Sequence, residues 1–131
     1  MHKFKKIFIV DDDKVFHFIF KKIILKRNED TVLYFFDNGY DAIKELKEKT
    51  TLTSDLPDLI LLDINMPIMD GWQFLEEYKL LKPQLVKIPE IYLISSSGDI
   101  LDLNKSKTYK DEIMKYLIKP VMLEHIDEIF N

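Results

Sequence analysis

The stretch Leu59-Ile60-Leu61-Leu62-Asp63 is a run of four apolar residues that ends on a carboxylate. Three further apolar runs also end on residues suited to binding a phosphoryl group. They are Ile7-Phe8-Ile9-Val10 before Asp11-Asp12, Ile91-Tyr92-Leu93-Ile94 before Ser95, and Tyr116-Leu117-Ile118 before Lys119-Pro120. Short apolar runs that stop at turns are typical of buried strands in a parallel sheet, whose carboxyl ends form the edge where ligands bind. We therefore expect acids, a hydroxyl and an amine to meet at one edge of a sheet.

Segments with helical periodicity alternate with these runs, which is the pattern of successive βαβ units. The expected strands are residues 4–10, 31–36, 58–62, 90–95 and 115–118. The expected helices are residues 13–27, 39–49, 71–81, 99–108 and 121–130. Because crossovers between parallel strands are right-handed, we predict a flavodoxin-like α/β fold. Its doubly wound sheet has five parallel strands in the order 2-1-3-4-5, with helices on both faces.

The composition is that of a globular protein, with 47% hydrophobic and 32% charged residues in a chain of 131. We expect a single domain over residues 1–131, without an output domain. The chain has no cysteine, which excludes disulfides and thiolate metal sites and fits the cytoplasm. The net charge of −4 and the lack of a basic stripe argue against nucleic-acid binding. No apolar run approaches the roughly 20 residues of a membrane span, so no membrane association is expected.

Three carboxylates, those of Asp11, Asp12 and Asp63, would crowd one edge of the predicted sheet. Two like charges about 4 Å apart repel by roughly 4 kcal/mol at an effective dielectric of about 20, so the fold needs a cation there. Carboxylate oxygens with room for water suit Mg²⁺, and Mn²⁺ is a possible substitute. Lys119 and Ser95 would add an ammonium and a hydroxyl, completing a cradle for phosphoryl oxygens. Asp63 could then act as a nucleophile and form an aspartyl phosphate.

Residues 58–71, DLILLDINMPIMDG, closely resemble the phosphorylation loop of response-regulator receiver domains from two-component signalling. The resemblance covers essentially the whole chain, in order. It implies that Asp63 is the phosphoacceptor, taking a phosphoryl group from a phosphohistidine of a histidine kinase or histidine phosphotransfer protein. It also implies that Asp11, Asp12 and Asp63 bind Mg²⁺ together with the backbone carbonyl of Asn65. Such a protein is not otherwise an enzyme, because its chemistry is limited to self-phosphorylation and slow autodephosphorylation.

The same resemblance assigns roles to residues near the phosphoacceptor. Ser95 matches the switch hydroxyl and Ser96 the small residue beside it, although a shift of one position would make Ser96 the switch. Lys119 matches the phosphate-binding lysine, with a cis bond to Pro120. Tyr116 matches the aromatic side chain that turns inward when the switch hydroxyl moves.

Two variable positions, Asn65 and Ser97, set the lifetime of the phosphoaspartate by resemblance. We expect output through protein binding or onward phosphotransfer to a target that the sequence does not identify. The expected output surface consists of residues 99–108, 115–118 and 121–130. The expected assembly is a monomer or a weak, phosphorylation-dependent dimer.

The first predicted helix has two kinds of apolar residue. Its expected core face consists of Phe16, Ile19, Phe20 and Ile23. At about 100° per residue, Phe18 and Leu25 point away from that face, beside lysines. In receiver domains this helix packs on the helical bundle of the phosphodonor, so Phe18 and Leu25 are candidate docking residues. The alternative is that they are two isolated apolar surface residues.

A phosphohydrolase of the haloacid dehalogenase type is the competing hypothesis, with Asp11 as its nucleophile. Asp11-Asp12-Asp13-Lys14-Val15 satisfies the first motif of that family, and Ser95 and Lys119 could supply its second and third. An acidic fourth motif is hard to find after Lys119, and this hypothesis leaves Asp63 unexplained. A flavin-binding module is less supported, because no glycine-rich phosphate loop follows the first strand.

Several polar residues fit structural roles better than binding roles. Asp13 and Asp70 are expected to cap helices, because carboxylates accept hydrogen bonds from the first free amides of a helix. The three histidines, His2, His17 and His125, are isolated in sequence and are expected on the surface.

Overall fold

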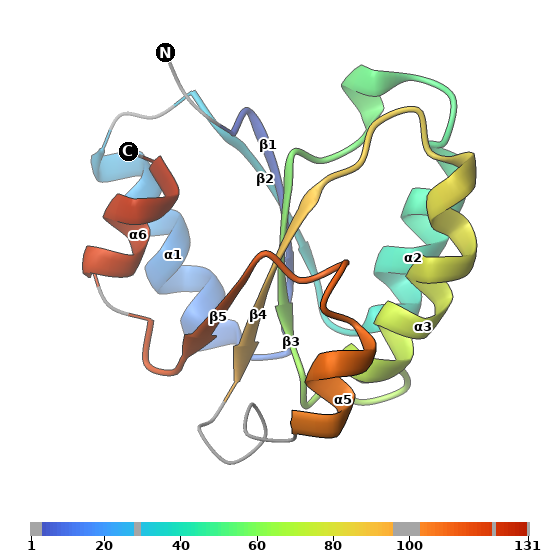
Figure 1. Ribbon diagram of the computed structural model, residues 1–131. Helices are drawn as coiled ribbons and strands as arrows, with labels where there is room; N and C mark the ends of the chain where they lie inside the picture. Colours follow the sequence, from blue (N-terminus) through green and yellow to red (C-terminus); the bar gives the residue numbers. More distant parts are fainter. Residues whose placement is uncertain (1–3, 28–29, 96–102, 122, 131) are drawn as a thin grey trace.

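A five-stranded parallel sheet forms the centre of the molecule, in a computed structural model that describes residues 4–27, 30–95, 103–121 and 123–130 (Figure 1). The strands are β1 (Lys6–Val10), β2 (Val32–Phe36), β3 (Leu59–Asp63), β4 (Glu90–Ser95) and β5 (Lys115–Ile118). Their order is β2-β1-β3-β4-β5, which confirms the predicted topology. Each pair of neighbouring strands is parallel, as successive βαβ crossovers require.

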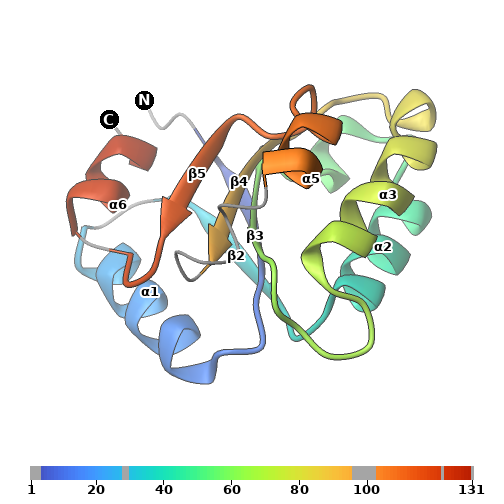
Figure 2. The same ribbon diagram turned by 60° about the horizontal axis from the view of Figure 1, so that its bottom comes forward.

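Helices cover both faces of the sheet, as predicted. They are α1 (Lys14–Lys26), α2 (Gly39–Glu48), α3 (Gly71–Leu81), α5 (Leu103–Thr108) and α6 (Leu123–Phe130). Helices α1 and α6 lie on one face, and α2, α3 and α5 lie on the other (Figures 1 and 2). Two short 3₁₀ helices, η1 (Thr53–Asp55) and η2 (Lys82–Gln84), interrupt the longer connections. Of the expected helix 99–108, residues 103–108 are helical and 99–102 lie outside the described residues.

Alternate residues of the central strands feed two separate cores. On β3, Leu59 and Leu61 pack with α1 and α6, whereas Ile60 and Leu62 pack with α2 and α3. Every residue of β3 is buried, which is why this strand is a continuous apolar run rather than an alternating one. The sheet therefore supports a rigid carboxyl edge, because its central strand is packed on both faces.

The buried face of α1 differs from the predicted one. His17, Phe20 and Ile24 are the buried residues of this helix. Ile19, predicted to be in the core, is instead about half exposed, so that prediction was wrong. The predicted surface position of His17 was also wrong, since only 9% of this residue is exposed. Helix α1 is therefore rotated relative to the core face that simple hydrophobicity predicts.

Local contacts at the carboxyl edge hold the helices close to the strand ends. Gly71 donates its N–H to the carbonyl of Ile64 at 2.8 Å. A Cβ at this glycine would lie 2.6 Å from the backbone oxygen of Asp63, which is closer than any side chain allows. The predicted caps are confirmed: the Asp13 carboxylate accepts from α1, and the Asp70 carboxylate forms a capping box with Gln73.

Candidate functional site

Three aspartates come together where β1 and β3 end. Asp11 and Asp12 follow β1, and Asp63 is the last residue of β3. One carboxylate oxygen from each lies within 4.8 Å of the others. Asp11 and Asp63 are only 1% and 4% exposed, whereas Asp12 is exposed to solvent. The three acids therefore converge at one edge of the sheet, as expected from the strand ends.

Lys119 reaches this cluster from the end of β5. Its Nζ lies 3.1 Å from Asp11 Oδ2 and 3.7 Å from Asp63 Oδ2. The same Nζ is 5.9 Å from the centre of the Phe16 ring on α1. The Lys119–Pro120 peptide bond is cis, as the family resemblance implied. One ammonium group is thus held between two buried carboxylates.

The electrostatics of the cluster show an excess of negative charge. Burial, followed by the charge on the Asp11 carboxylate, raises the pKa of Asp63 to about 7, although Lys119 acts to lower it. Burial also raises the pKa of Asp11, although the Asp13 amide and Lys119 oppose that change. For Lys119, burial acts to lower the pKa, but the Asp11 and Asp63 carboxylates outweigh it and the pKa is raised.

A divalent cation fits this donor set. Among the described residues, three carboxylates gather at this edge; Lys119 pairs with those of Asp11 and Asp63, and the third, that of Asp12, is open to water. Hard oxygen donors with access for water are the ligands that Mg²⁺ prefers, and Mn²⁺ accepts the same set. A bound dication would also offset the Asp11 and Asp12 charges that, together with the larger effect of burial, raise the pKa of Asp63. Asp11, Asp12 and Asp63 are therefore the residues that would hold the ion.

Three hydrogen bonds hold Asp11 in place. Its N–H donates to the carbonyl of Phe36 on β2 at 2.9 Å, and its Oδ1 accepts from the N–H of Asp13 at 2.9 Å. Its carbonyl oxygen lies 2.5 Å from Nε2 of His17. This contact of His17 was not predicted from the sequence, where the available signal was a histidine one turn into the helix that follows the acidic turn.

The remaining predicted site residues are only partly described. Asn65 lies in the exposed loop after β3, and Tyr116 lies on β5 with about two fifths of its surface exposed. Ser95 ends β4, where it pairs with Ile118, so its backbone lies at the same edge as Asp63. Ser96 and Ser97 fall outside the described residues.

The loop between β3 and α3 contains a strained residue. Ile68 has a φ of 68°, in the left-handed region that β-branched residues rarely adopt. Its side chain is 78% exposed, so no burial compensates for this conformation.

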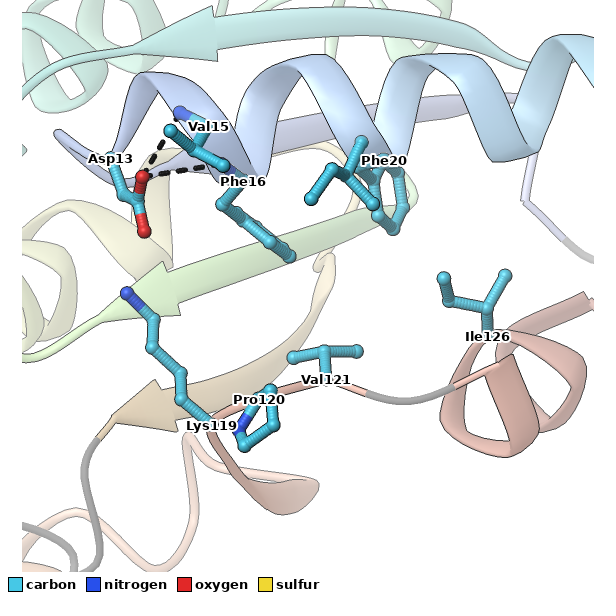
Figure 3. A pocket seen from close by; sticks show the side chains of 9 residues that line it. Asp13, Val15, Phe16, Phe20, Lys119, Pro120, Val121 and Ile126 are labelled. Carbon is cyan, nitrogen blue, oxygen red and sulfur yellow. Dashed lines mark hydrogen bonds between the residues drawn. The ribbon is translucent and has the colours of Figure 1, made fainter.

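An apolar groove of about 400 Å³ adjoins the carboxylate cluster, between α1 and the segment that links β5 to α6 (Figure 3). Asp13 and Lys119 lie at one end of this groove, and Phe20 and Ile126 lie toward the other. Its full lining is Asp13, Val15, Phe16, Ile19, Phe20, Lys119, Pro120, Val121 and Ile126. The half-exposed Ile19 is explained by this groove. The predicted docking residues Phe18 and Leu25 are 61% and 70% exposed, but they do not line it.

Comparison with known proteins identifies the family. A family model described as the response regulator receiver domain matches residues 7–131. Chemotaxis protein CheY of Bacillus subtilis is 31% identical over 129 residues, which span 96% of this chain and 98% of that protein. The match to the transcriptional regulator NtrC of Proteus hauseri is 30% identical and spans 87% of this chain but only 21% of that longer protein.

Solved structures agree with this assignment. A two-component response regulator from Cytophaga hutchinsonii superimposes with a TM-score of 0.77 and 25% identity, covering 97% of this chain and 94% of that one. The Mn²⁺-bound form of response regulator Rcp1 has a TM-score of 0.72 and 25% identity, covering 95% and 88% of the two chains. A Mg²⁺-bound receiver domain of a Pseudomonas aeruginosa sensor histidine kinase has a TM-score of 0.73 and 18% identity, covering 95% and 93%.

The fold, the carboxylate cluster and these matches define a receiver domain of two-component signalling. This chain belongs to the response regulator receiver domain family and resembles CheY along almost its whole length. It is a signalling protein rather than a conventional enzyme, and the haloacid dehalogenase alternative is not supported. Among the described residues, every helix is too short or too polar to cross a bilayer.

Proposed function

We propose that Asp63 is the phosphoacceptor of this chain and receives its phosphoryl group from a phosphohistidine. A carboxylate oxygen of Asp63 attacks phosphorus, the bond between phosphorus and the imidazole nitrogen breaks, and the imidazole leaves with that electron pair. The product is an acyl phosphate on Asp63 and a histidine that takes up a proton from water. The observation that carries this proposal is a buried carboxylate at the end of β3 with an ammonium group 3.7 Å away.

The other residues of the cluster prepare this carboxylate for reaction. Asp11 and Asp12, with Asp63 and the Asn65 carbonyl, would hold a divalent cation, Mg²⁺ or Mn²⁺. When bound, the ion supplies positive charge for the phosphoryl oxygens and neutralises the acidic cluster. Lys119 supports the proposal because its Nζ already lies between the carboxylates of Asp11 and Asp63.

Signalling would then follow from a changed surface. Ser95 and Ser96 are the proposed phosphoryl-contacting residues, and Tyr116 is the proposed aromatic switch. Asn65 and Ser97 are the proposed determinants of phosphoryl lifetime. The proposed output is binding of a protein target, or onward phosphotransfer, by a chain that acts as a single receiver domain.

The phosphodonor is a histidine kinase or a histidine phosphotransfer protein, and we propose α1 as its docking surface. Phe18 and Leu25 would contact the donor on the outer side of α1, and Val15 and Ile19 would contact it in the groove beside Lys119. Helix α1 contains four lysines and no acidic residue, although the whole chain has a net charge of −4. A donor surface with apolar and acidic side chains would complement this helix.

Phosphorylation by acetyl phosphate tests the chemistry directly. We expect wild-type protein to gain the mass of one phosphoryl group with Mg²⁺ and not with EDTA, and peptide mapping to locate it on Asp63. Asp63→Ala should remain unmodified, whereas Asp111→Asn, an exposed aspartate before β5, should react normally. Phosphomonoester turnover that depends on Asp11 and not on Asp63 would instead contradict the proposal.

The docking surface is tested by comparing two phosphodonors. Phe18→Ala and Leu25→Ala should slow transfer from a phosphorylated histidine phosphotransfer protein while leaving the rate with acetyl phosphate unchanged. Tyr40→Ala, which removes an exposed aromatic side chain from α2, is the matched control. Equal effects on both donors would reject α1 as the docking surface.

A further inference from the structure

His17 is a buried polar residue that contacts the carboxylate cluster through the backbone. The residue is 9% exposed, and its Nε2 lies 2.5 Å from the carbonyl oxygen of Asp11. Its ring packs against Phe35 of β2, with 4.7 Å between the ring centres. His17 thus links α1, the turn after β1, and the neighbouring strand.

The chemistry of this contact defines which atom donates. A carbonyl oxygen can only accept a hydrogen bond, so Nε2 of His17 must carry the hydrogen. The carbonyl belongs to the peptide group that joins Asp11 to Asp12. Because a peptide group is planar, holding its oxygen also fixes the direction in which the chain enters Asp12.

Besides the ion pair between its carboxylate and Lys119, Asp11 makes three hydrogen bonds that act on different parts of the residue. Phe36 holds its N–H and Asp13 holds its carboxylate, whereas His17 holds its carbonyl. Asp12 is exposed, so packing against neighbours contributes little to the position of its carboxylate. The orientation of the preceding peptide group is therefore the main local constraint on where Asp12 can reach.

We propose that His17 is a positioning residue that aligns the Asp11 and Asp12 carboxylates for a divalent cation. This inference rests on the proposed function, in which Asp11, Asp12 and Asp63 bind that cation. Residues that orient metal ligands without touching the metal commonly change affinity by about 10-fold to 100-fold when they are replaced. His17 acts on the peptide group between two ligands, so its removal should weaken the site without removing any ligand.

The test is the dissociation constant for Mg²⁺ and Mn²⁺, measured by isothermal titration calorimetry in the absence of any phosphodonor. His17→Leu keeps an apolar side chain and removes the donor, and we expect both cations to bind about 10-fold more weakly. His17→Gln restores an N–H donor, and we expect its affinity to lie within about threefold of wild type. Ile24→Ala is the control, because it truncates a buried residue of α1 that is remote from the turn.

The outcomes separate this inference from the proposed function. Unchanged cation binding in His17→Leu, or an equal loss in Ile24→Ala, would overturn the role of His17 while leaving the metal site intact. Failure of the wild-type chain to bind either cation would overturn the proposed function and this inference together.

A second measurement needs no variant and remains decisive if His17→Leu fails to fold. Long-range ¹⁵N–¹H correlation spectra of wild-type protein report which ring nitrogen of His17 is protonated. We expect a protonated Nε2. A neutral ring protonated only at Nδ1 would overturn the hydrogen bond to Asp11 and the inference with it.

Discussion

Replacing Asp63 with asparagine should stabilise the metal-free protein, although it removes the proposed phosphoacceptor. In the folded state the Asp63 carboxylate has an oxygen within 4.8 Å of oxygens on Asp11 and Asp12. At an effective dielectric of about 20, the repulsion from Asp11 alone is about 3.5 kcal/mol, and Lys119 at 3.7 Å returns about 4.5 kcal/mol. Repulsion from Asp12 and the cost of burial come in addition, so the balance is unfavourable.

The raised pKa of Asp63 gives the size of the unfavourable free energy of its ionised carboxylate in the folded state. A change from the ordinary value of 3.8 to about 7 corresponds to about 4 kcal/mol at 1.36 kcal/mol per unit, which is an upper limit. Because Asp12 is exposed and its charge is screened, we expect Asp63→Asn to raise the free energy of unfolding by about 2 kcal/mol at pH 8 in EDTA.

The pH dependence has a defined sign. Since the folded-state pKa of Asp63 is raised, the unfolded chain loses this proton first, and wild-type stability falls between about pH 4 and pH 7. The advantage of Asp63→Asn should therefore be small at pH 5 and reach its full size above pH 7. The difference in free energy of unfolding between variant and wild type is measured by urea unfolding, followed by circular dichroism at several pH values in EDTA. A variant no more stable than wild type at pH 8, or an advantage that shrinks as pH rises, would refute this account.

Three further variants test local features of the fold. Asp58 accepts hydrogen bonds from two backbone amides and from Lys87, which lower its pKa despite its partial burial. Asp58→Asn should cost about 1–2 kcal/mol at pH 7 in urea unfolding, and the loss should shrink as the pH falls below the ordinary carboxyl pKa of 3.8 toward the lowered pKa of the folded state. Ile68→Asn should stabilise by about 1 kcal/mol in the same assay, because asparagine tolerates a positive φ and the exposed isoleucine loses no packing; a destabilised variant would show that Ile68 makes contacts that offset its strain. Gly71→Ala should cost about 2 kcal/mol and slow modification by acetyl phosphate, because the added Cβ collides with the backbone of Asp63; wild-type stability and rate would contradict the close approach.

Much of the sheet could be predicted because its central strands are buried on both faces. The observed strand β3, Leu59–Asp63, is shifted by one residue from the expected strand 58–62. The agreement is close because an uninterrupted apolar run leaves little choice of where the strand begins and ends. At the edges the prediction was less accurate. Residue 4 was expected to begin the first strand, but β1 begins at Lys6, and Phe4 is buried outside the ladder. Burial alone therefore does not decide where hydrogen bonding between strands starts.

The convergence of Asp11, Asp63 and Lys119 could be predicted for the same reason, because parallel strands end at a common edge. The rotation of α1 could not be predicted from the sequence. Hydrophobic periodicity treats histidine as a surface residue, yet a hydrogen bond to a backbone carbonyl allows His17 to be buried. Ile19 is exposed because α1 and the β5–α6 segment leave a groove between them, which depends on packing between distant parts of the chain.

Lys119 is part of both the carboxylate cluster and the groove, since its ammonium group pairs with Asp11 and Asp63 while its side chain lines the groove beside α1. A small molecule with an apolar body and an acidic head would fit the groove, where its acid would compete with Asp11 and Asp63 for the ammonium group of Lys119. Inhibitor discovery against this chain can therefore begin at a pocket next to the reactive carboxylate, without mimicking a phosphoryl group.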